Sequence, residues 1–365
     1  MGFRCGIVGL PNVGKSTLFN AITAVGAAAE NYPFCTIEPN LGVVPVPDNR
    51  LDTLAKIYRP GKVTPAAIEF VDIAGLVKGA SKGEGLGNQF LSHIREVDAI
   101  CHVVRCFEDE NVVHVDGTVN PQRDIGVVET ELILKDVETV EKRLAEAEKG
   151  SKSGDQKIRT EAGFYARVRE HLFNGRLAIY EKPGTPDEQF WLRDLHLLTA
   201  KPVMYIANVD ERHLAAKDGY VKEVEDIASK EGAMVVVACT KIEAEIAPMP
   251  YKEREQFLHD LGIEESGLDQ VIRKGYQLLN LITFFTCGPK EVHAWTLKRG
   301  TAAPQAAGQV HSDMERGFIR AEVMRYVDLA RLGSEAAVKE KGLLHIEGRE
   351  YIVDDGDVIF FRFNV

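Results

Sequence analysis

The sequence predicts an α/β fold, with a mostly parallel β-sheet covered by helices on both faces, an inserted antiparallel helical hairpin and a C-terminal α+β domain. Apolar runs of strand length recur through the first 280 residues, a long polar segment with heptad spacing interrupts them, and short strands separated by glycine turns begin near Leu281. We therefore expect residues 1–127 and 199–280 to form one domain, residues 128–198 the inserted hairpin, and residues 281–365 the last domain.

Length and charge limit the classes of protein that this chain can represent. With 365 residues, 45% of them hydrophobic and 27% charged, it is long enough for two or three soluble domains. The formal net charge of −11 argues against indiscriminate binding to nucleic acid, although a local basic patch is compatible with it. No apolar stretch approaches the ~18–20 residues that span a bilayer, and the N-terminus lacks the pattern of a secretory signal. We expect a cytoplasmic protein with no membrane partner.

The first element is an apolar run, Cys5 to Val8, that leads into the phosphate-binding pattern G-x-x-x-x-G-K-S from Gly9 to Ser16. A glycine-rich loop of this spacing turns successive backbone N–H groups toward phosphates, and the helix expected after it places its positive N-terminal end against them. We expect Lys15 to reach the β- and γ-phosphates and Ser16 to bind Mg²⁺, and we count Lys15 with the catalytic residues. The expected nucleotide contacts in this loop are Asn12, Val13, Gly14, Lys15, Ser16 and Thr17.

Two later segments carry residues that would complete a magnesium site. Thr36 lies in a loop marked by two prolines, and in switch GTPases a threonine of this loop closes on Mg²⁺ and the γ-phosphate. The apolar strand over residues 67–71 ends in the pattern D-x-x-G, with Asp72 for the Mg²⁺ shell and the Gly75 N–H for the γ-phosphate. Leu76 follows, where many GTPases place the glutamine that orients the attacking water. Because leucine cannot hydrogen-bond water, hydrolysis is either intrinsically slow or depends on a polar group from elsewhere.

The base-reading element follows another apolar run and reads Asn208-Val209-Asp210-Glu211. The guanine-reading pattern is N-K-x-D, in which the lysine stem packs on the base and the aspartate accepts the N1 and N2 hydrogens of guanine. Val209 replaces that lysine and Glu211 replaces that aspartate. A carboxylate one methylene longer cannot take the same bidentate position without moving the base. We therefore expect ATP to bind at least as tightly as GTP, with Asn208, Val209 and Glu211 near the base.

Between these motifs, a polar segment has the periodicity of two packed helices. Two apolar series step by three or four residues, as a helix-packing seam requires, and a polar break at 151–155 separates them. The segment from Glu129 to Leu177 is therefore expected to be an antiparallel helical hairpin. The members of the two seams are Ile133, Val137, Val140 and Leu144, then Ile158, Ala162, Tyr165, Val168 and Leu172. The charged residues are typical of a solvated face, and six of them form a candidate basic strip: Lys149, Lys152, Lys157, Arg159, Arg167 and Arg169.

From about Leu281 the sequence pattern is typical of a separate α+β domain. Expected strands cover residues 283–286, 294–297, 351–353 and 358–363, and a helical stretch covers 311–316. Basic and aromatic residues cluster here and offer either an RNA-facing surface or the ordinary charged face of a half-buried sheet. They are Lys298, Arg299, Arg316, Phe318, Arg320, Arg325 and Tyr326.

Taken together, four motifs and one tail block resemble the Obg-like ATPases of the YchF type. They are G-L-P-N-V-G-K-S, N-Y-P-F-C-T-I-E-P-N, D-I-A-G-L, N-V-D-E and, in the tail, A-P-Q-A-A-G-Q-V-H-S-D-M-E-R-G-F-I-R-A. The resemblance runs from Met1 to Val365, and the tail block resembles the TGS domain of that family. It implies a P-loop GTPase-like domain, an ATPase activity that tolerates GTP, and three domains. It also implies association with the ribosome or its large (50S) subunit, with rRNA or tRNA contacts through the hairpin and TGS surfaces.

Two residues are candidates for supporting hydrolysis. With Leu76 unable to orient water, the loop from Glu108 to Pro121 is the expected source of a polar group, and it holds His114. A neutral imidazole holds or deprotonates water at cytoplasmic pH; the alternative is an exposed loop histidine. Asn12 resembles the P-loop asparagine that supports a K⁺ ion beside the phosphates in several related nucleotide switches; the alternative is a turn-forming asparagine.

Three functions remain open on this sequence. The leading hypothesis is a slow Mg²⁺-dependent ATPase that acts as a molecular switch on the translation apparatus. A GTPase of ordinary specificity is the second, and the residues at positions 209 and 211 argue against it. The third is a binding adaptor that uses nucleotide only to set its shape, which the apolar residue at position 76 favours in part.

Overall fold

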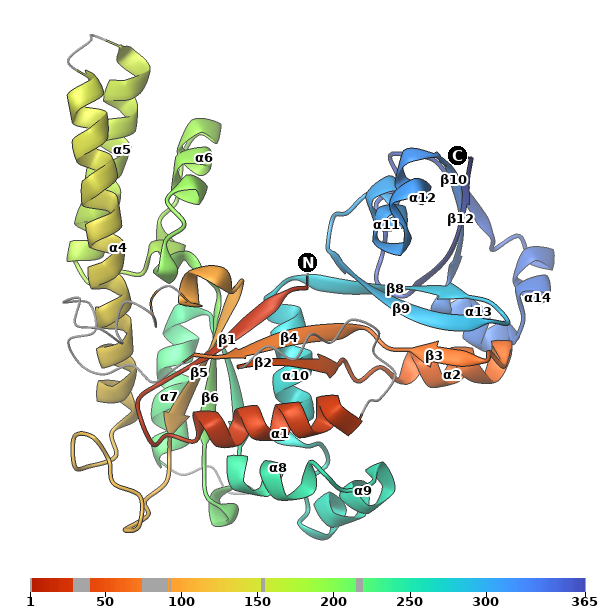
Figure 1. The fold of residues 1–365 in the computed structure, drawn as a ribbon, viewed down its shortest axis with the longest axis horizontal. Coiled ribbons are helices and arrows are strands. Elements are labelled where there is room, and N and C mark those ends of the chain that lie inside the picture. Colours follow the sequence, from red (N-terminus) through yellow and green to blue (C-terminus); the bar gives the residue numbers. More distant parts are fainter. Residues whose placement is uncertain are drawn as a thin grey trace.

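The computed structural model describes residues 2–28, 40–73, 91, 93–151, 155–214 and 219–364. Two six-stranded sheets form the body of this part of the chain. A helical hairpin extends from one side of the first sheet, and the second sheet lies on the opposite side (Figure 1). The predicted α/β fold with an inserted hairpin is confirmed.

The first sheet, sheet A, has the strand order β2-β4-β1-β5-β6-β7. Its strands are β1 (Arg4–Val8), β2 (Leu41–Pro45), β4 (Ala67–Asp72), β5 (Ala99–Arg105), β6 (Val203–Asn208) and β7 (Met234–Ala238). All neighbouring strands are parallel except β2, which runs antiparallel to β4. The carboxyl ends of the parallel strands therefore meet at one edge, which is where sheets of this kind bind ligands.

Helices cover both faces of sheet A. They are α1 (Lys15–Ala28), α7 (Gly219–Glu231), α8 (Thr240–Ile246), α9 (Tyr251–Asp260), α10 (Gly267–Leu278) and the first turns of α4 (Pro121–Ser151). Val103 of β5 faces a core that contains side chains of α1 and α10, and the next residue, Val104, faces a core that contains side chains of α7. Neighbouring residues of a strand point to opposite faces, so β5 is buried on both sides.

The hairpin consists of α4 and α5 (Gln156–Phe173), with the shorter α6 (Pro186–Asp194) beside it (Figure 1). The predicted packing seams are confirmed, because Val140 of α4 and Val168 of α5 are fully buried in the same core. The boundaries differ from the expected 129–177. Helix α4 begins at Pro121, whose fixed φ suits a first helical position, and its Ile125 packs into the nucleotide domain. Helix α5 ends at Phe173, just before Gly175 with a φ of +72°.

The chain returns from the hairpin to sheet A through two short 3₁₀ turns, η2 (Ala178–Tyr180) and η3 (Leu198–Ala200). Asp136 of α4 is buried beside η3, where its carboxylate accepts the N–H groups of Leu198 over 2.7 Å and Thr199 over 2.8 Å. This buried carboxylate joins the lower part of the hairpin to the strand that follows, β6.

The second sheet, sheet B, has the order β11-β10-β12-β8-β9-β3. Its strands are β3 (Lys62–Thr64), β8 (Leu281–Cys287), β9 (Glu291–Lys298), β10 (Phe318–Arg325), β11 (His345–Glu347) and β12 (Asp357–Phe363). The sequence led us to expect a separate C-terminal domain. The structure differs, because β3 comes from the N-terminal part of the chain and pairs parallel with β9 of this sheet. Helix α2 (Asn49–Tyr58), which precedes β3, is capped by Asp48 and also packs against this sheet.

Four further helices complete the C-terminal part: α11 (Ala303–Val310), α12 (Ser312–Arg316), α13 (Tyr326–Leu332) and α14 (Glu335–Glu340). The strand expected at 351–353 is wrong, since Ile352 makes only an isolated bridge to Ala302. Strand β10 was not predicted, and a register shift between Phe318 and Arg320 explains why its inward and outward residues do not alternate. Within the described part of the chain, no helix is long and apolar enough to span a membrane.

Candidate nucleotide-binding site

The loop after β1 adopts a conformation that requires both of its glycines. Gly9 has a φ of +151°, and a Cβ atom there would lie 2.4 Å from the carbonyl oxygen of Val103. Gly14 has a φ of +101°, and a Cβ atom there would lie 2.3 Å from the Nδ2 atom of Asn208. The loop is therefore packed against β5 on one side and against the end of β6 on the other, with no room for side chains.

Lys15 is the first residue of α1, and its ammonium group is buried beneath the loop. Its Nζ atom donates a hydrogen bond to the main-chain carbonyl of Leu10 over 2.7 Å. Burial lowers the pKa of Lys15 to about 8, an effect that the negative charge of Asp72 opposes. A phosphate group beside this ammonium would favour its charged form, as the predicted role requires.

Asp72 and Ser16 lie together at the edge of the loop. Asp72 ends β4, in register with Ile7 of the neighbouring β1, and its carboxylate accepts a hydrogen bond from the Ser16 side chain. Burial raises the pKa of Asp72, whereas the charge of Lys15 and the bond from Ser16 oppose that shift. Its Oδ1 atom is buried and has no hydrogen-bond partner among the residues that the structure describes.

An orphaned carboxylate oxygen beside a serine hydroxyl suits Mg²⁺, which prefers hard oxygen ligands. The residues that the structure places at the expected magnesium site therefore fit the metal. Thr36, Gly75 and Leu76, which also belong to the expected site, lie outside the described residues.

Asn208, at the end of β6, joins the phosphate loop to α8. Its Nδ2 atom donates to the main-chain carbonyl of Val13 over 2.8 Å, and its Oδ1 atom accepts the N–H of Thr240 over 3.0 Å. The asparagine is 2% exposed. Its side chain therefore holds the phosphate-binding and base-binding segments at a fixed separation.

A cavity of about 660 Å³ opens beside this bridge. The phosphate loop, the residues after β6 and the start of α8 form one wall, and the segment after β5 forms the other. Its lining residues are Asn12, Gly14, Thr17, Phe107, Glu108, Asp109, Val112, Asn208, Val209, Asp210, Glu211, Arg212, Cys239, Thr240 and Lys241. The N-V-D-E element thus lines one cavity together with three of the predicted phosphate-loop contacts, whereas Val13, Lys15 and Ser16 are not among its lining residues.

Phe107 in the second wall of the cavity, and Arg105 beside it, were missed by sequence reasoning, whereas the rest of this wall belongs to the predicted loop from Glu108 to Pro121. Phe107 lies under the guanidinium group of Arg105, whose carbon is 4.7 Å from the ring centre. Arg105 is buried and donates to the main-chain carbonyls of Phe107, Asp109 and Val112. An arginine at the end of a buried parallel strand, followed by an aromatic residue, is the pattern that would have pointed to this wall.

The base-reading element has three differently placed side chains. Val209 is buried in the core beside α7, whereas the carboxylate of Asp210 accepts the N–H groups of Arg212 and His213 at the start of the short 3₁₀ turn η4 (Glu211–His213). Glu211 is exposed at the cavity, and its Oε1 atom lies 3.5 Å from Nζ of Lys241. Val209 therefore supplies packing beneath the site, and the two acidic residues of the element, Asp210 and Glu211, both line the cavity.

His114 lies in the loop between β5 and α4, and its ring is buried. Its Nε2 atom lies 2.9 Å from Oδ2 of Asp124, and its Nδ1 atom accepts the N–H of Asp116 over 3.1 Å. The neighbouring residue, Val113, accepts a hydrogen bond from the side chain of Asn12 over 3.1 Å, so this loop contacts the phosphate loop directly. Asn12 itself has a φ of +62°, which fits its turn-forming interpretation and leaves the K⁺ interpretation untested.

Two bacterial proteins match this chain over its whole length. The protein named Ribosome-binding ATPase YchF of Bacillus subtilis (strain 168) is 54% identical over 367 residues, and the protein of the same name of Escherichia coli O157:H7 is 54% identical over 366 residues. Each comparison covers 100% of both chains. This chain belongs to the YchF family.

Two family models and one solved structure agree with that assignment. Residues 4–134 match the model described as 50S ribosome-binding GTPase, and residues 281–364 match the YchF-GTPase_C model, described as a protein of unknown function (DUF933). The structure of the Schizosaccharomyces pombe YchF GTPase is 39% identical, with a TM-score of 0.90, and the match covers 99% of this chain and 98% of that one. The α/β P-loop fold of the YchF family is therefore the fold of this chain.

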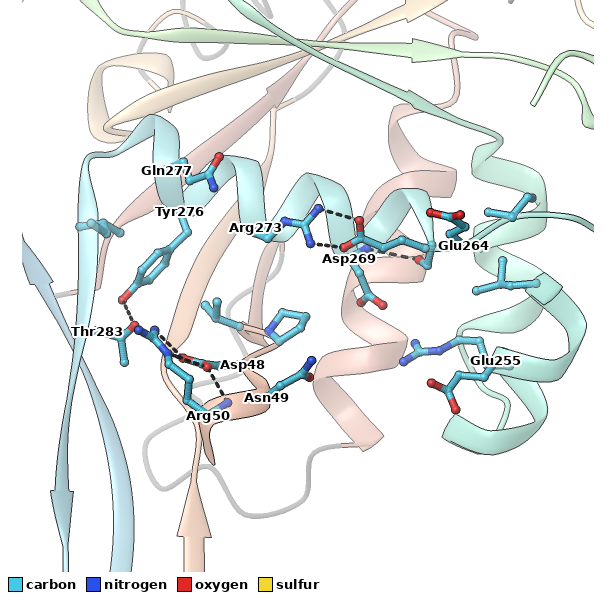
Figure 2. Close-up of a pocket in the computed structure, with 18 of the residues that line it drawn as sticks. Asp48, Asn49, Arg50, Glu255, Glu264, Asp269, Arg273, Tyr276, Gln277 and Thr283 are labelled. Atoms are coloured by element: carbon cyan, nitrogen blue, oxygen red, sulfur yellow. Dashed lines mark hydrogen bonds and ion pairs between the residues drawn. The ribbon is translucent and has the colours of Figure 1, made fainter. Parts of the chain in front are cut away.

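This YchF-family chain also has a larger cavity, of about 1000 Å³, between α2, α9, α10 and β8. In Figure 2 the guanidinium groups of Arg50 and Arg273 each pair with carboxylates of the cavity wall. Arg50 bonds to Asp48 over 2.7 Å, and Arg273 bonds to Glu265 over 2.6 Å. Because these guanidinium groups are already paired with carboxylates of the cavity wall, we assign the nucleotide to the smaller cavity, which adjoins the phosphate loop.

Proposed function

We propose that this chain is a slow Mg²⁺-dependent ATPase that acts as a nucleotide switch and binds the ribosome or its large (50S) subunit. The observation that carries the ATPase part is the cavity in which the phosphate loop and the N-V-D-E element meet. The ribosome part rests on the names of the bacterial relatives. A cytoplasmic location follows from that partner.

Each residue of the phosphate site has a chemical role in this proposal. The backbone N–H groups of the loop, including Val13, Gly14 and Thr17, hold the phosphates, and Lys15 neutralises the β/γ-oxygens. Ser16 and Asp72 would hold Mg²⁺, together with Thr36, and the N–H of Gly75 would meet the γ-phosphate. Mg²⁺ held by these residues would neutralise the negative charge that develops on the phosphates.

The choice of ATP over GTP rests on the residues around the base, because the names of the relatives differ on this point. Guanine recognition needs a carboxylate that accepts two hydrogens at once, and the longer Glu211 lies at the cavity with the ammonium group of Lys241 3.5 Å away. Val209 is buried in the domain core and leaves no lysine stem to pack on the base. A carboxylate here accepts the exocyclic amino group of adenine without the bidentate geometry that guanine requires.

We assign the support of the attacking water to His114, since leucine at position 76 cannot bind water. The contact between Asn12 and Val113 brings the histidine-bearing loop to the phosphate loop. With both ring nitrogens already bonded, His114 must leave its present position before it acts. Asn12 is also the residue that we expect to support K⁺ beside the phosphates.

The division into three parts belongs to the same proposal: residues 1–127 with 199–280 bind nucleotide, residues 128–198 form the hairpin, and residues 281–365 form the TGS domain. The hairpin and the TGS surface are the parts assigned to rRNA or tRNA. The basic strip of the hairpin is weaker than its sequence implied, because Arg167 pairs with Glu181 and Glu188. Lys157 likewise lies 3.6 Å from Asp187. We therefore expect the ribosomal contact to depend on the shape of the hairpin more than on a continuous positive surface.

A binding adaptor with little intrinsic catalysis is the second candidate, favoured by the engaged ring of His114. Phosphate release from ATP with and without purified 50S subunits separates the two functions. The ATPase proposal expects measurable turnover with Mg²⁺-ATP and co-sedimentation with the subunits. Co-sedimentation that depends on nucleotide, without turnover in either condition, would identify an adaptor; no co-sedimentation in any nucleotide state would remove the ribosomal partner.

A further inference from the structure

The loop between β5 and α4 buries a histidine and exposes the valines on either side of it. His114 is 8% exposed, whereas Val113 is 74% and Val115 is 50% exposed. Burial of apolar side chains would favour the opposite arrangement, with the valines inside and the imidazole in water. Hydrophobic burial therefore does not hold this part of the loop in place, and specific polar contacts of the ring must do so.

Those contacts use both nitrogens of the ring. The main-chain N–H of Asp116 donates to Nδ1, so Nδ1 carries a lone pair and the proton of the neutral ring sits on Nε2. The Nε2–H group then donates to Oδ2 of Asp124 over 2.9 Å. Neither nitrogen has a lone pair left for a water molecule while these two bonds persist.

Asp124 belongs to α4 and is held there, although the neighbouring Arg123 also bonds to the loop, through the carbonyl of Thr118 and, at 3.6 Å, the carboxylate of Asp116. The side chain of Asp124 is 3% exposed, and its second oxygen, Oδ1, accepts the guanidinium group of Arg123 over 3.0 Å. The N–H of Asp124 donates to the carbonyl of Asn120 at the start of the helix. Asp124 therefore stays in place when the loop moves.

The other bonds of the loop leave a short segment between two fixed points. Arg105 holds the carbonyls of residues 107, 109 and 112, which fixes the first half of the loop. The carbonyl of Val113 is bonded to Asn12 of the phosphate loop. His114 therefore follows directly after the residue that is bonded to the phosphate loop, and its own side chain is bonded to Asp124 of α4.

We propose that Asp124 is a positioning residue that latches His114 in a buried position and so limits how often the ring is free to act at the phosphate loop. This inference rests on the role proposed above for His114. When the latch opens, the ring keeps its single proton on Nε2, and the lone pair of Nδ1, no longer bonded to the Asp116 N–H, is free to take a proton from the water whose oxygen attacks the γ-phosphorus as the bond to ADP breaks. As the ring leaves its buried position, the exposed side chains of Val113 and Val115 move into the space that it occupied.

The test combines a chemical probe of the ring with the hydrolysis rate. Diethyl pyrocarbonate attacks a free imidazole lone pair, so modification of His114, followed by peptide mass spectrometry, reports how often the latch is open. His259, whose side chain is 84% exposed, serves as the internal reference. The variants are Asp124→Asn, which keeps the shape and removes the charge, and Asp124→Ser, which cannot reach the ring. The control is Asp116→Asn, which makes the same charge change in the loop, keeps the main-chain N–H that bonds Nδ1, and weakens only the 3.6 Å ion pair between Asp116 and Arg123.

The latch predicts that both Asp124 variants raise the modification rate of His114 by at least about fivefold, equivalent to about 1 kcal/mol. Single-turnover hydrolysis at saturating Mg²⁺-ATP rises with it, and the rise disappears in the double variant His114→Ala/Asp124→Ser. Asp116→Asn leaves both the modification rate of His114 and the hydrolysis rate at their wild-type values.

Each contrary result has a separate meaning. An unchanged modification rate in both Asp124 variants contradicts the latch, whatever the hydrolysis rate. Faster modification without faster hydrolysis, in a protein that His114→Ala slows, contradicts the claim that the latch limits hydrolysis. Wild-type hydrolysis in His114→Ala overturns the proposed role of His114 itself, while the probe still reports on the latch.

Discussion

The side-chain amide of Asn208 donates a hydrogen bond to the main-chain carbonyl of Val13 over 2.8 Å, so the strand that carries the base-reading residues holds the phosphate loop directly. The same side chain accepts the N–H of Thr240, at the start of α8. Gly14 leaves the space for this bridge, because a Cβ atom there would collide with the Asn208 amide. The loop from Gly9 to Ser16 and the N-V-D-E element are therefore parts of one rigid unit.

Removal of the groups that act on the phosphates should abolish productive binding of Mg²⁺-triphosphate. Lys15→Ala removes the buried ammonium group, and Ser16→Ala removes a hydroxyl beside the orphaned oxygen of Asp72. Both variants should still fold, because neither side chain is part of the apolar core. Titration with ATP in the presence of Mg²⁺, alongside circular dichroism, checks both statements. Wild-type affinity and turnover in the two variants would rule out the phosphate-loop assignment.

Substitution of His114 should affect turnover and leave binding nearly intact. His114→Ala should lower the rate of ATP hydrolysis by roughly 10²-fold or less, with ATP affinity within a few-fold of wild type, as expected of a group that acts in the transition state. Steady-state kinetics and ATP titration on the same preparation measure the two quantities. Wild-type turnover would assign the role to a partner or to another loop.

The cation beside the phosphates can be tested without a mutation. If Asn12 supports K⁺, hydrolysis in K⁺ should be faster than in Na⁺ at equal ionic strength, because the smaller and more strongly hydrated ion does not fill the same site. Asn12→Ala should remove the difference. Identical rates in the two salts for the wild-type protein would leave Asn12 with its turn-forming role alone.

A carboxylate pair at the base of the hairpin predicts a loss of stability with rising pH. The phenol oxygen of Tyr205 lies 3.0 Å from Oε1 of Glu129 and 2.7 Å from Oε2 of Glu231, and the main-chain carbonyl of Glu231 accepts the hydroxyl of Tyr180. One phenol hydrogen cannot serve both carboxylates, so a proton is held on one of them. Burial, and then the charge of Glu231, raise the pKa of Glu129 to about 7.

Because the folded state holds this proton and the unfolded state releases it near pH ~4.3, the free energy of unfolding should fall as the pH rises through about 7. The expected loss between pH 5.5 and 7.5 is about 1–2 kcal/mol. Urea unfolding across this range measures it. Glu231→Gln removes the opposing charge and should flatten the dependence; an equal slope in the variant and the wild type would contradict the assignment.

Local sequence patterns predicted the helices and loops whose conformation depends on residues close to one another in the sequence. The helix seams through Val140 and Val168 follow from spacing alone, and the loop from Gly9 to Ser16 follows from its glycines. Strand β3 could not be found in this way, because its partner, β9, lies more than two hundred residues later and short edge strands have little pattern of their own. Long-range pairing depends on packing that a single sequence does not display.

The same limit applies to the site. Lys15, Asp72 and Asn208 follow from motifs, and the structure places all three beside the loop from Gly9 to Ser16. The hydrogen-bond partner of His114 could not be predicted from a motif, since Asp124 resembles any acidic residue in the first turn of a helix. A buried hydrogen bond between a loop and a helix produces no periodic pattern in the sequence, so it is found only in the structure.

Calorimetric titration of the wild-type protein with ATP and with GTP, each with Mg²⁺, tests the proposed preference for adenine most directly. ATP should bind at least as tightly as GTP, and the double variant Val209→Lys/Glu211→Asp should move the preference toward GTP. A wild-type protein that binds GTP about tenfold more tightly than ATP, a difference of about 1.4 kcal/mol, would contradict the claim.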